Sequence, residues 1–475
     1  MINDLYNIFL PQASLILFIL IQLVMSLFMG DKKHNVARCL SAVGISISIL
    51  LLSTVQVEPQ YFGFRGALMS DSYTLLFHFV ILLCGFFVVL LTRNISEQMK
   101  QNAFVFHSLI LTAILGALSV ISANDFLTLF VSLELLSFST YFLIASAKGY
   151  FSKEASFKYL ITNAVSTGIF LFGVSYLYGL TSSLNLTEIY EIVVERESSL
   201  IYTFSSVMII FGLLSKLAIF PFANWVVDVF KGTETSVLAY LSTIPKLALF
   251  GIICRLIVFP LGVSFELTFL LAIVALITAF WANTYAIREK NVKVILACSS
   301  AANAAYILLA ASLVSVYNLS TVIFYLICYV LMNIGAFAFL NIAESNGIGM
   351  LVDDFKGLFK ENHGMVFAYV IAIIGLAGFP ITSGFIAKIY LFSAIAHSGL
   401  IFIPFLIILL ILTVVALYYY LKLIMPLFEP VDKGQIIKTA YSQKFVLVIV
   451  VVVTILIGIF PEKLIELCRF IAYNI

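Results

Sequence analysis

Apolar runs long enough to cross a membrane follow one another along almost the whole chain. Of its 475 residues, 63% are hydrophobic and 11% are charged, so nearly all of the chain must lie in a bilayer. We therefore expect an all-α integral membrane protein with a single polytopic membrane domain, residues 1–475, and no soluble domain. Runs of roughly 20 apolar residues between polar turns predict fourteen spans, near residues 10–29, 39–56, 73–92, 104–122, 126–147, 156–178, 201–227, 236–257, 264–286, 292–314, 318–342, 365–397, 400–425 and 444–461.

Lysine and arginine are distributed unevenly between alternate loops. Assigning each one to a loop places 17 in the odd-numbered loops and 5, Arg255 among them, in the even-numbered loops and the tails. Because cytoplasmic loops carry an excess of Lys and Arg, we expect the odd-numbered loops in the cytoplasm. Both termini are then expected outside.

Four lysines remain inside predicted spans: Lys158, Lys216, Lys246 and Lys388. A lysine at the centre of a membrane helix costs about 2.5–3.5 kcal/mol on insertion scales, so its default interpretation is a functional cation site. Burial lowers the pKa of a lysine, which allows a buried lysine to exchange protons near neutral pH. Snorkelling of the ammonium to the membrane surface is the alternative. For Lys158, which follows Lys153 and Glu154 near a helix end, both interpretations stay open.

Glu134 is the one acidic residue predicted deep within a span. A lone buried carboxylate takes up a proton, whereas a carboxylate that faces a lysine can stay ionised. We expect Glu134 to be the partner of Lys216 and to set its proton affinity. The alternative is a neutral Glu134 bonded to a neighbouring carbonyl group.

Two of the expected spans are interrupted by proline. Pro221 follows Lys216 by five residues, and the overlong run 365–397 contains Gly378-Phe379-Pro380 and Gly384. Proline removes a backbone donor, and a broken membrane helix is tolerated where its backbone lines a cavity. The two breaks fall at corresponding places in two sets of five spans, which predicts paired five-helix repeats over residues 104–257 and 264–425. An odd number of helices in each repeat would make the two repeats inverted.

Motifs for a resident cofactor or metal are lacking in the sequence. The six cysteines have no CxxC or paired spacing, so we expect them to be packing residues. No GxGxxG follows a predicted strand. We therefore expect no cofactor-binding residues, no metal ligands and no redox centre in this chain.

Several stretches around these residues resemble the antiporter-like, proton-translocating membrane subunits of respiratory complex I, the NADH-quinone oxidoreductase, and subunit N most closely. They occur in the family's order and span most of the chain. They are Leu133-Glu134-Leu135-Leu136-Ser137, Ala155-Ser156-Phe157-Lys158-Tyr159, the segment 177–184, the segment from Lys216 to Arg255, Asn291 to Tyr306 and Gly375 to Phe392.

The resemblance implies fourteen helices with two inverted five-helix repeats and a proton path in the membrane plane. Glu134, Lys216, Lys246 and Lys388 occupy the positions of that path. It also implies a multi-pass protein of the bacterial inner (cytoplasmic) membrane, with both termini on the periplasmic side. Its partners would be the other membrane and peripheral subunits of complex I, membrane lipids and protons, with no nucleic acid. NADH, FMN, iron–sulfur clusters and quinone would be bound by the partner subunits.

The sequence departs from the family pattern at three places. Ala223 and Asn303 stand where relatives usually carry histidine, and Gly232-Thr233-Glu234 replaces a turn commonly written Gly-Ala-Pro. We expect water to replace the missing imidazoles. Two rival functions remain, a subunit of a multisubunit Na⁺/H⁺ antiporter or membrane-bound hydrogenase, and a stand-alone secondary transporter for an organic solute.

Overall fold

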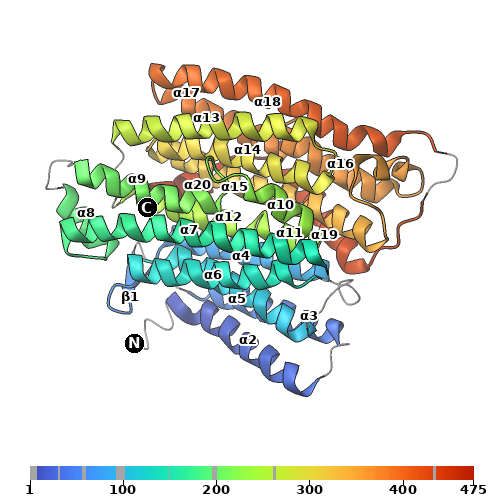
Figure 1. Ribbon diagram of the computed structural model, residues 1–475, viewed down its shortest axis with the longest axis horizontal. Helices are drawn as coiled ribbons and strands as arrows, with labels where there is room; N and C mark the ends of the chain where they lie inside the picture. Colours follow the sequence, from blue (N-terminus) through green and yellow to red (C-terminus); the bar gives the residue numbers. More distant parts are fainter. Residues whose placement is uncertain are drawn as a thin grey trace.

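The computed structural model describes residues 8–29, 33–55, 60–92, 102–147, 149–194, 200–259, 261, 264–431 and 435–474. Figure 1 shows the helices side by side along the long axis of the molecule, with strand β1, helix α8 and both chain ends toward the left. The predicted orientation rests on lysines and arginines assigned to loops, and six of these lie outside the described residues: Lys32, Arg93, Lys100, Lys148, Arg196 and Lys433.

Helices of membrane-spanning length confirm the expected membrane fold. Twelve described spans are long and apolar enough to cross a bilayer, and two shorter apolar helices, Leu200–Lys216 and His363–Ala377, belong to the proline-interrupted runs. Every one of the fourteen predicted runs therefore has its helix. The long helices are α2 (Leu10–Phe28), α3 (His34–Leu52), α4 (Ser72–Leu91), α5 (Ala103–Ser122), α6 (Phe126–Ala145), α7 (Tyr150–Thr181), α13 (Phe265–Arg288), α14 (Val292–Ser312), α15 (Val316–Ser345), α18 (Ile403–Ile424) and α19 (Tyr441–Ile459).

Shorter elements complete the described chain. A hairpin of β1 (Tyr61–Gly63) and β2 (Leu68–Ser70), paired antiparallel, adds a small strand pair that the sequence analysis did not predict. Helices α8 (Leu186–Val194) and α20 (Glu462–Tyr473) were also not predicted, because neither is an apolar run of spanning length. The 3₁₀ turns are η3 (Val352–Phe355), η4 (Leu358–Lys360), η5 (Leu400–Phe402) and η6 (Met425–Phe428).

Side-chain caps fix where several of the spans begin. Asp71 accepts a hydrogen bond from the backbone N–H of Thr74 at 2.8 Å and so caps α4, and Asp125 caps α6 in the same way. Asn291 caps α14 through the N–H of Lys293. A helix leaves its first N–H groups without partners inside the helix, so a short polar side chain at this position satisfies them.

Both predicted breaks are present. Helix α9 (Leu200–Lys216) ends at Lys216, and α10 (Trp225–Gly232) begins after an irregular segment that contains Pro221. Helix α16 (His363–Ala377) ends before Gly378, whose φ of +86° favours glycine, and α17 (Ser383–His397) begins after Pro380. The bounds of the two repeats, 104–257 and 264–425, stay a prediction.

The structure contains a third break that we did not predict. Residues 236–257 were expected to form one continuous helix, but the chain forms α11 (Thr235–Leu241) and α12 (Ile244–Val258). Pro245 stands in the first turn of α12 and has no N–H to donate, and the hydroxyl of Thr243 bonds the carbonyl of Ala239 at 2.6 Å. Lys246 therefore lies directly after a helix break.

Burial differs strongly between the spans. The spans 235–258 and 292–312 are buried throughout their most apolar window, and α15 is buried over 94% of it, whereas α18 and α19 are only 28% buried. The outer helices thus present apolar side chains outward, where lipid is expected. The polar residues of the wholly buried α12 and α14 must instead find partners inside the protein.

Candidate functional site

Lys216 is the last residue of α9, where the break turns its side chain toward α6 and α7. Its side chain is 5% exposed, and its Nζ donates hydrogen bonds to Ser137 Oγ at 2.9 Å and to Asn163 Oδ1 at 3.1 Å. The carboxylate of Glu134 lies 3.9 Å from the same ammonium. The structure therefore brings together the two residues that the sequence analysis paired.

Glu134 has a second polar contact besides Lys216. Its Oε1 accepts a hydrogen bond of 2.7 Å from the hydroxyl of Thr167 on α7. The hydroxyl donates a hydrogen bond to the carboxylate, and the ammonium places the opposite charge close to it. At 3.9 Å, Glu134 and Lys216 attract each other without forming a hydrogen bond. Because the Coulomb energy depends on distance, small movements of either side chain change the strength of this attraction.

Lys246 lies in the first turn of α12 and points toward α14. Its Nζ donates to the carbonyl oxygen of Ser300 at 2.7 Å and also to the Ser300 hydroxyl, and it lies 5.6 Å from the centre of the Tyr329 ring. These contacts are neutral. Lys246 thus differs from Lys216, which has a carboxylate close by.

Polar side chains follow one face of α14 between Lys246 and Lys388. Asn303 lies three or four residues after the adjacent Ser300 and Ser299, and Tyr306 lies three residues after Asn303, which places them on neighbouring turns. Asn303 accepts a hydrogen bond of 2.6 Å from the Tyr325 hydroxyl. The Tyr306 ring in turn lies 6.0 Å from the Nζ of Lys388.

Lys388 is held by the broken end of α16. Its Nζ donates to the carbonyl oxygens of Leu376 at 2.9 Å and Ala377 at 2.8 Å. The last carbonyl groups of a helix have no partner inside the helix and carry its negative dipole end, so they suit an ammonium group. The break at Gly378 therefore creates the binding position of the lysine ten residues later.

Neither position that lacks the family histidine carries an ionisable side chain. Ala223 is buried at 2% exposure in the irregular segment between α9 and α10. Asn303 cannot exchange protons at ordinary pH, but its amide connects Tyr325 with Ser299, whose carbonyl oxygen accepts from it at 2.8 Å. The roles of both positions in proton movement stay predictions.

Lys158 does not join this interior group. Its side chain is 42% exposed and forms ion pairs of 2.8 Å with Glu154 and with Asp228 of α10. The three residues line a cavity of about 340 Å³ together with Lys231 and Asn291. Of the five candidate residues, four face the interior and Lys158 lies near the end of its helix.

Two ion pairs were missed by the sequence analysis. Arg255, assigned to a loop, is buried inside α12 and bonds both carboxylate oxygens of Asp71, so that assignment was wrong. Lys293, also assigned to a loop, is 4% exposed and pairs with Glu344. The position of Arg255 inside the apolar run 236–257 was a signal that could have identified it.

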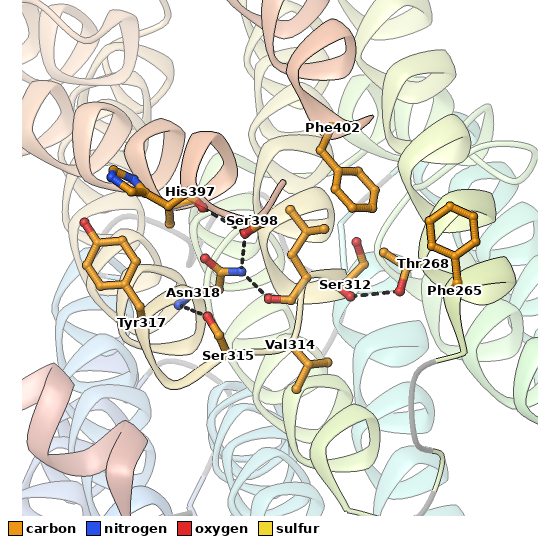
Figure 2. Close-up of a pocket in the computed structure, with 12 residues that line it drawn as sticks. Phe265, Thr268, Ser312, Val314, Ser315, Tyr317, Asn318, His397, Ser398 and Phe402 are labelled. Carbon is orange, nitrogen blue, oxygen red and sulfur yellow. Dashed lines mark hydrogen bonds between the residues drawn. The ribbon is translucent and has the colours of Figure 1, made fainter. Parts of the chain in front are cut away.

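A larger hollow of about 730 Å³ lies where α14 and α17 end and α13 and α15 begin. Figure 2 shows Asn318 at its centre, donating to Ser398 Oγ at 2.9 Å, and Ser315 bonded to the backbone of Asn318. Thr268 reaches the carbonyl of Ser312 across the hollow at 3.3 Å. None of the five candidate residues lines it.

Groups that could hold a metal ion were not found within the described ranges, where no three His, Cys, Asp or Glu side chains converge. All six cysteines are free of disulfides, and five of them are buried. The candidate site therefore consists of one carboxylate and three ammonium groups with hydroxyl, amide and carbonyl partners.

Known proteins match nearly the whole chain. The family model described as NADH:quinone oxidoreductase/Mrp antiporter, TM, matches residues 123–415. A relative named NADH-quinone oxidoreductase subunit N, from Anoxybacillus flavithermus, is 34% identical over 96% of this chain and 95% of its own length.

Solved structures share the fold. A chain of a membrane-bound sulfane sulfur reductase, an archaeal respiratory membrane complex, aligns with a TM-score of 0.87 at 24% identity over 100% of this chain and 97% of that one. A chain of respiratory complex I from Thermus thermophilus aligns with a TM-score of 0.83 at 24% identity, covering 97% and 99%. With the family model and the curated relatives, these matches establish that the chain belongs to the NADH:quinone oxidoreductase/Mrp antiporter family, among the subunits N of NADH-quinone oxidoreductase.

Proposed function

We propose that this chain moves protons across the membrane through Glu134, Lys216, Lys246 and Lys388, coupled to quinone reduction in partner subunits. The observation that carries the proposal is the burial of three lysines on three separate helices. Lys216 and Lys246 lie beside a helix break, and the ammonium of Lys388 bonds the carbonyl groups at another. Family membership gives the same function, because relatives are named as subunits of NADH-quinone oxidoreductase.

The charges of the four residues favour a transport role over a structural one. Three ammonium groups and one carboxylate would leave two uncompensated positive charges inside the membrane if all were ionised. Lysines that served only packing would carry the free-energy cost of burying these charges without any compensating gain. Lysines that release and take up protons in turn avoid it, because only part of the set is charged at any time.

The contacts along α14 support one shared path. Lys246 bonds Ser300, and the hydroxyl of Ser300 lies 2.6 Å from that of Tyr329. Ser299, Asn303 and Tyr306 continue the polar face toward Lys388. Water between these groups completes the path, taking the place of the two missing histidines.

The redox chemistry belongs to the partner subunits. NADH, FMN, iron–sulfur clusters and quinone are bound there, and this chain contributes no redox centre of its own. Its exposed apolar helices contact lipid in the bacterial inner membrane, and both termini lie on the periplasmic side. Lys158, with Glu154 and Asp228, serves at the surface where protons enter.

The test is proton uptake by vesicles that contain the purified, assembled complex. Lys216→Ala and Lys246→Ala should each reduce proton uptake per quinone reduced at least several-fold. Lys444→Ala, which removes an exposed lysine, is the matched control and should pump normally. Full pumping by an assembled Lys246→Ala complex would overturn the proposal. Co-purification with small antiporter subunits in place of flavin and iron–sulfur subunits would favour the Na⁺/H⁺ antiporter alternative.

A further inference from the structure

A second cluster of charges lies away from the four-residue path, where α10, α14 and α15 meet. Lys293 Nζ donates to the carbonyl oxygen of Thr233 at 3.0 Å and to Glu344. The other oxygen of Glu344 accepts from the N–H of Thr235 at 3.0 Å and from its hydroxyl. The residue between these two threonines is Glu234.

Glu234 itself has no such partner. Both of its carboxylate oxygens are shielded from solvent and accept no hydrogen bond from the described residues. The charged groups that face it are Lys293 of α14 and Glu344 of α15, and Lys231 and Asp228 precede it on α10. Two carboxylates thus share one buried lysine, which leaves one surplus negative charge if both are ionised.

A proton on Glu234 removes that surplus. Burial and the nearby Glu344 raise the pKa of Glu234 to about 7, against the opposing effect of Lys293. Glu344 has its lysine and two donors from Thr235, whereas the Glu234 carboxylate accepts no hydrogen bond from the described residues. Glu234 is the one left to bind the proton.

A cavity lies beside the segments of chain that lead into the cluster. The cavity of about 340 Å³ that Lys158, Asp228 and Lys231 line also includes Gly232 and Asn291. Gly232 lies two residues before Glu234, and Asn291 lies two residues before Lys293. The cavity therefore borders the chain two residues before Glu234 and two residues before Lys293.

Polar side chains lead inward from Glu234 along α11. The hydroxyl of Ser236 is buried and has no partner among the described residues, as expected where a water molecule completes the hydrogen bonds. One turn further, Tyr240 bonds Thr140 of α6 at 2.8 Å. Thr140 lies one turn from Ser137, which accepts the hydrogen bond of Lys216.

We propose that Glu234 is a proton-binding residue that takes a proton from the cavity beside Lys158 and passes it inward along Ser236 and Tyr240 toward Lys216. The inward step rests on the proposed function, whereas proton binding by Glu234 does not. In the first step, a hydronium ion in the cavity gives a proton to the Glu234 carboxylate and becomes water. In the second, the neutral carboxyl group passes this proton through water to an uncharged Lys216, which leaves a Glu234 carboxylate and a Lys216 ammonium, so charge and protons balance.

This residue distinguishes the chain from the family pattern. The resemblance described under the sequence analysis implies a Gly-Ala-Pro turn at this place, whereas this chain has Gly232-Thr233-Glu234. Proline cannot bind a proton. The chain therefore carries an additional titratable group at the start of the proposed path from the cavity to Lys216. It lacks the imidazole group at Ala223.

The first experiment measures proton binding in the resting, assembled complex, without turnover. Infrared difference spectra recorded across a pH titration should contain a protonated carboxyl band that Glu234→Gln removes. Glu361→Gln, which changes an exposed carboxylate, is the control and should retain the band. Lys293→Gln should raise the titration midpoint and Glu344→Gln should lower it, because they remove the nearby positive and negative charge.

Three outcomes of that titration would overturn proton binding by Glu234. The first is a band that persists in Glu234→Gln, and the second is a midpoint that neither neighbouring variant moves. The third is a midpoint that shifts when sodium replaces choline at constant ionic strength, which would identify a metal-cation site. If Glu234→Gln does not assemble, Glu234→Asp provides the same measurement with a displaced midpoint.

The second experiment tests transfer inward through pumping. Proton uptake per quinone reduced should fall several-fold in Glu234→Gln, and Glu234→Asp should restore part of it with a shifted pH profile. Normal pumping by Glu234→Gln would overturn the inward transfer and leave the titration result intact. Normal pumping by Lys216→Ala would contradict the proposed function instead, so the two failures are distinguishable.

Discussion

Arg255 and Asp71 form a fully buried ion pair that joins the first repeat to the N-terminal helices. Arg255 Nη2 lies 2.8 and 2.7 Å from the two carboxylate oxygens of Asp71, and the side chains are 1% and 0% exposed. Asp71 also caps α4, and Arg255 Nη1 bonds the carbonyl of Ile121 at the end of α5. One contact thus fixes three helices.

Asp71→Asn should destabilise the protein strongly. It leaves the Arg255 guanidinium buried without a countercharge, which costs about 3–5 kcal/mol when one partner of a buried pair is removed. The measurement is the thermal unfolding midpoint of the detergent-solubilised chain. The control Asp353→Asn affects an exposed pair with Lys356 and should change the midpoint little. Equal midpoints for both variants would contradict the assigned role.

Glu134→Gln should assemble normally but pump poorly. The amide keeps the shape of the side chain and can accept the Thr167 hydroxyl, while the charge near Lys216 is lost. Proton uptake by vesicles, corrected for the amount of assembled complex, should fall several-fold. Glu462→Gln changes an exposed residue and is the matched control. Normal uptake by an assembled Glu134→Gln complex would count against the carboxylate setting the proton affinity of Lys216.

Losses at Lys246 and Lys388 should be non-additive if both residues belong to one path. Lys246→Arg keeps the charge but holds its proton too tightly to exchange it, so it should depress pumping as Lys246→Ala does. Adding Lys388→Ala should then remove little more. The readout is proton uptake for the single and double variants. Independent multiplicative losses would indicate two separate paths.

Gly384→Ala should displace Lys388 without altering any charged residue. A Cβ on Gly384 would lie 2.0 Å from the carbonyl oxygen of Gly375, so α17 must move away from α16. Lys388 would then lose its contacts with Leu376 and Ala377, and both stability and pumping should fall. The control is Gly364→Ala on the same helix pair, where a Cβ meets no atom within 4 Å. Similar behaviour of the two variants would refute the steric argument.

Glu234 should make the stability of the folded chain fall as pH rises. Its pKa is raised from 4.5 to about 7, so the native state holds a proton between these values that the unfolded state has released. That contribution is complete below pH 4.5 and lost as pH rises through 7. Glu234→Gln lacks the effect and should be more stable than the original chain above pH 7, by about 3 kcal/mol at most. Parallel unfolding curves from pH 5 to 8 would argue against it.

The sequence predicts the spans well because each span is a local property. A run of 20 apolar residues is sufficient evidence for a helix in a bilayer, and a proline in an overlong run indicates where the helix breaks. The break before Lys246 was missed, because a window average over 236–257 hides the effect of Thr243 and Pro245. Helix α20 was not predicted because it is amphipathic and too short to span a bilayer.

Partners of the charged residues are harder to predict than the residues themselves. Arg255 lies 184 residues from Asp71 in sequence, and Lys293 lies 51 from Glu344, so no local pattern indicates either pair. Both basic residues stand near helix ends, where a hydropathy profile assigns them to loops. Glu134 and Lys216 could be paired from sequence only because so few charges were available inside the spans.

The second repeat holds its lysine with backbone atoms, and this has a consequence for how Lys388 can be controlled. The carbonyl groups of Leu376 and Ala377 cannot be titrated, and no side-chain replacement removes them. Lys216, by contrast, has the carboxylate of Glu134 3.9 Å from its ammonium. A shift of α16 against α17 is therefore the direct way to change what surrounds the ammonium of Lys388. In the proposed path, the proton affinity of Lys388 would then depend on the position of a helix, and that of Lys216 on a neighbouring charge.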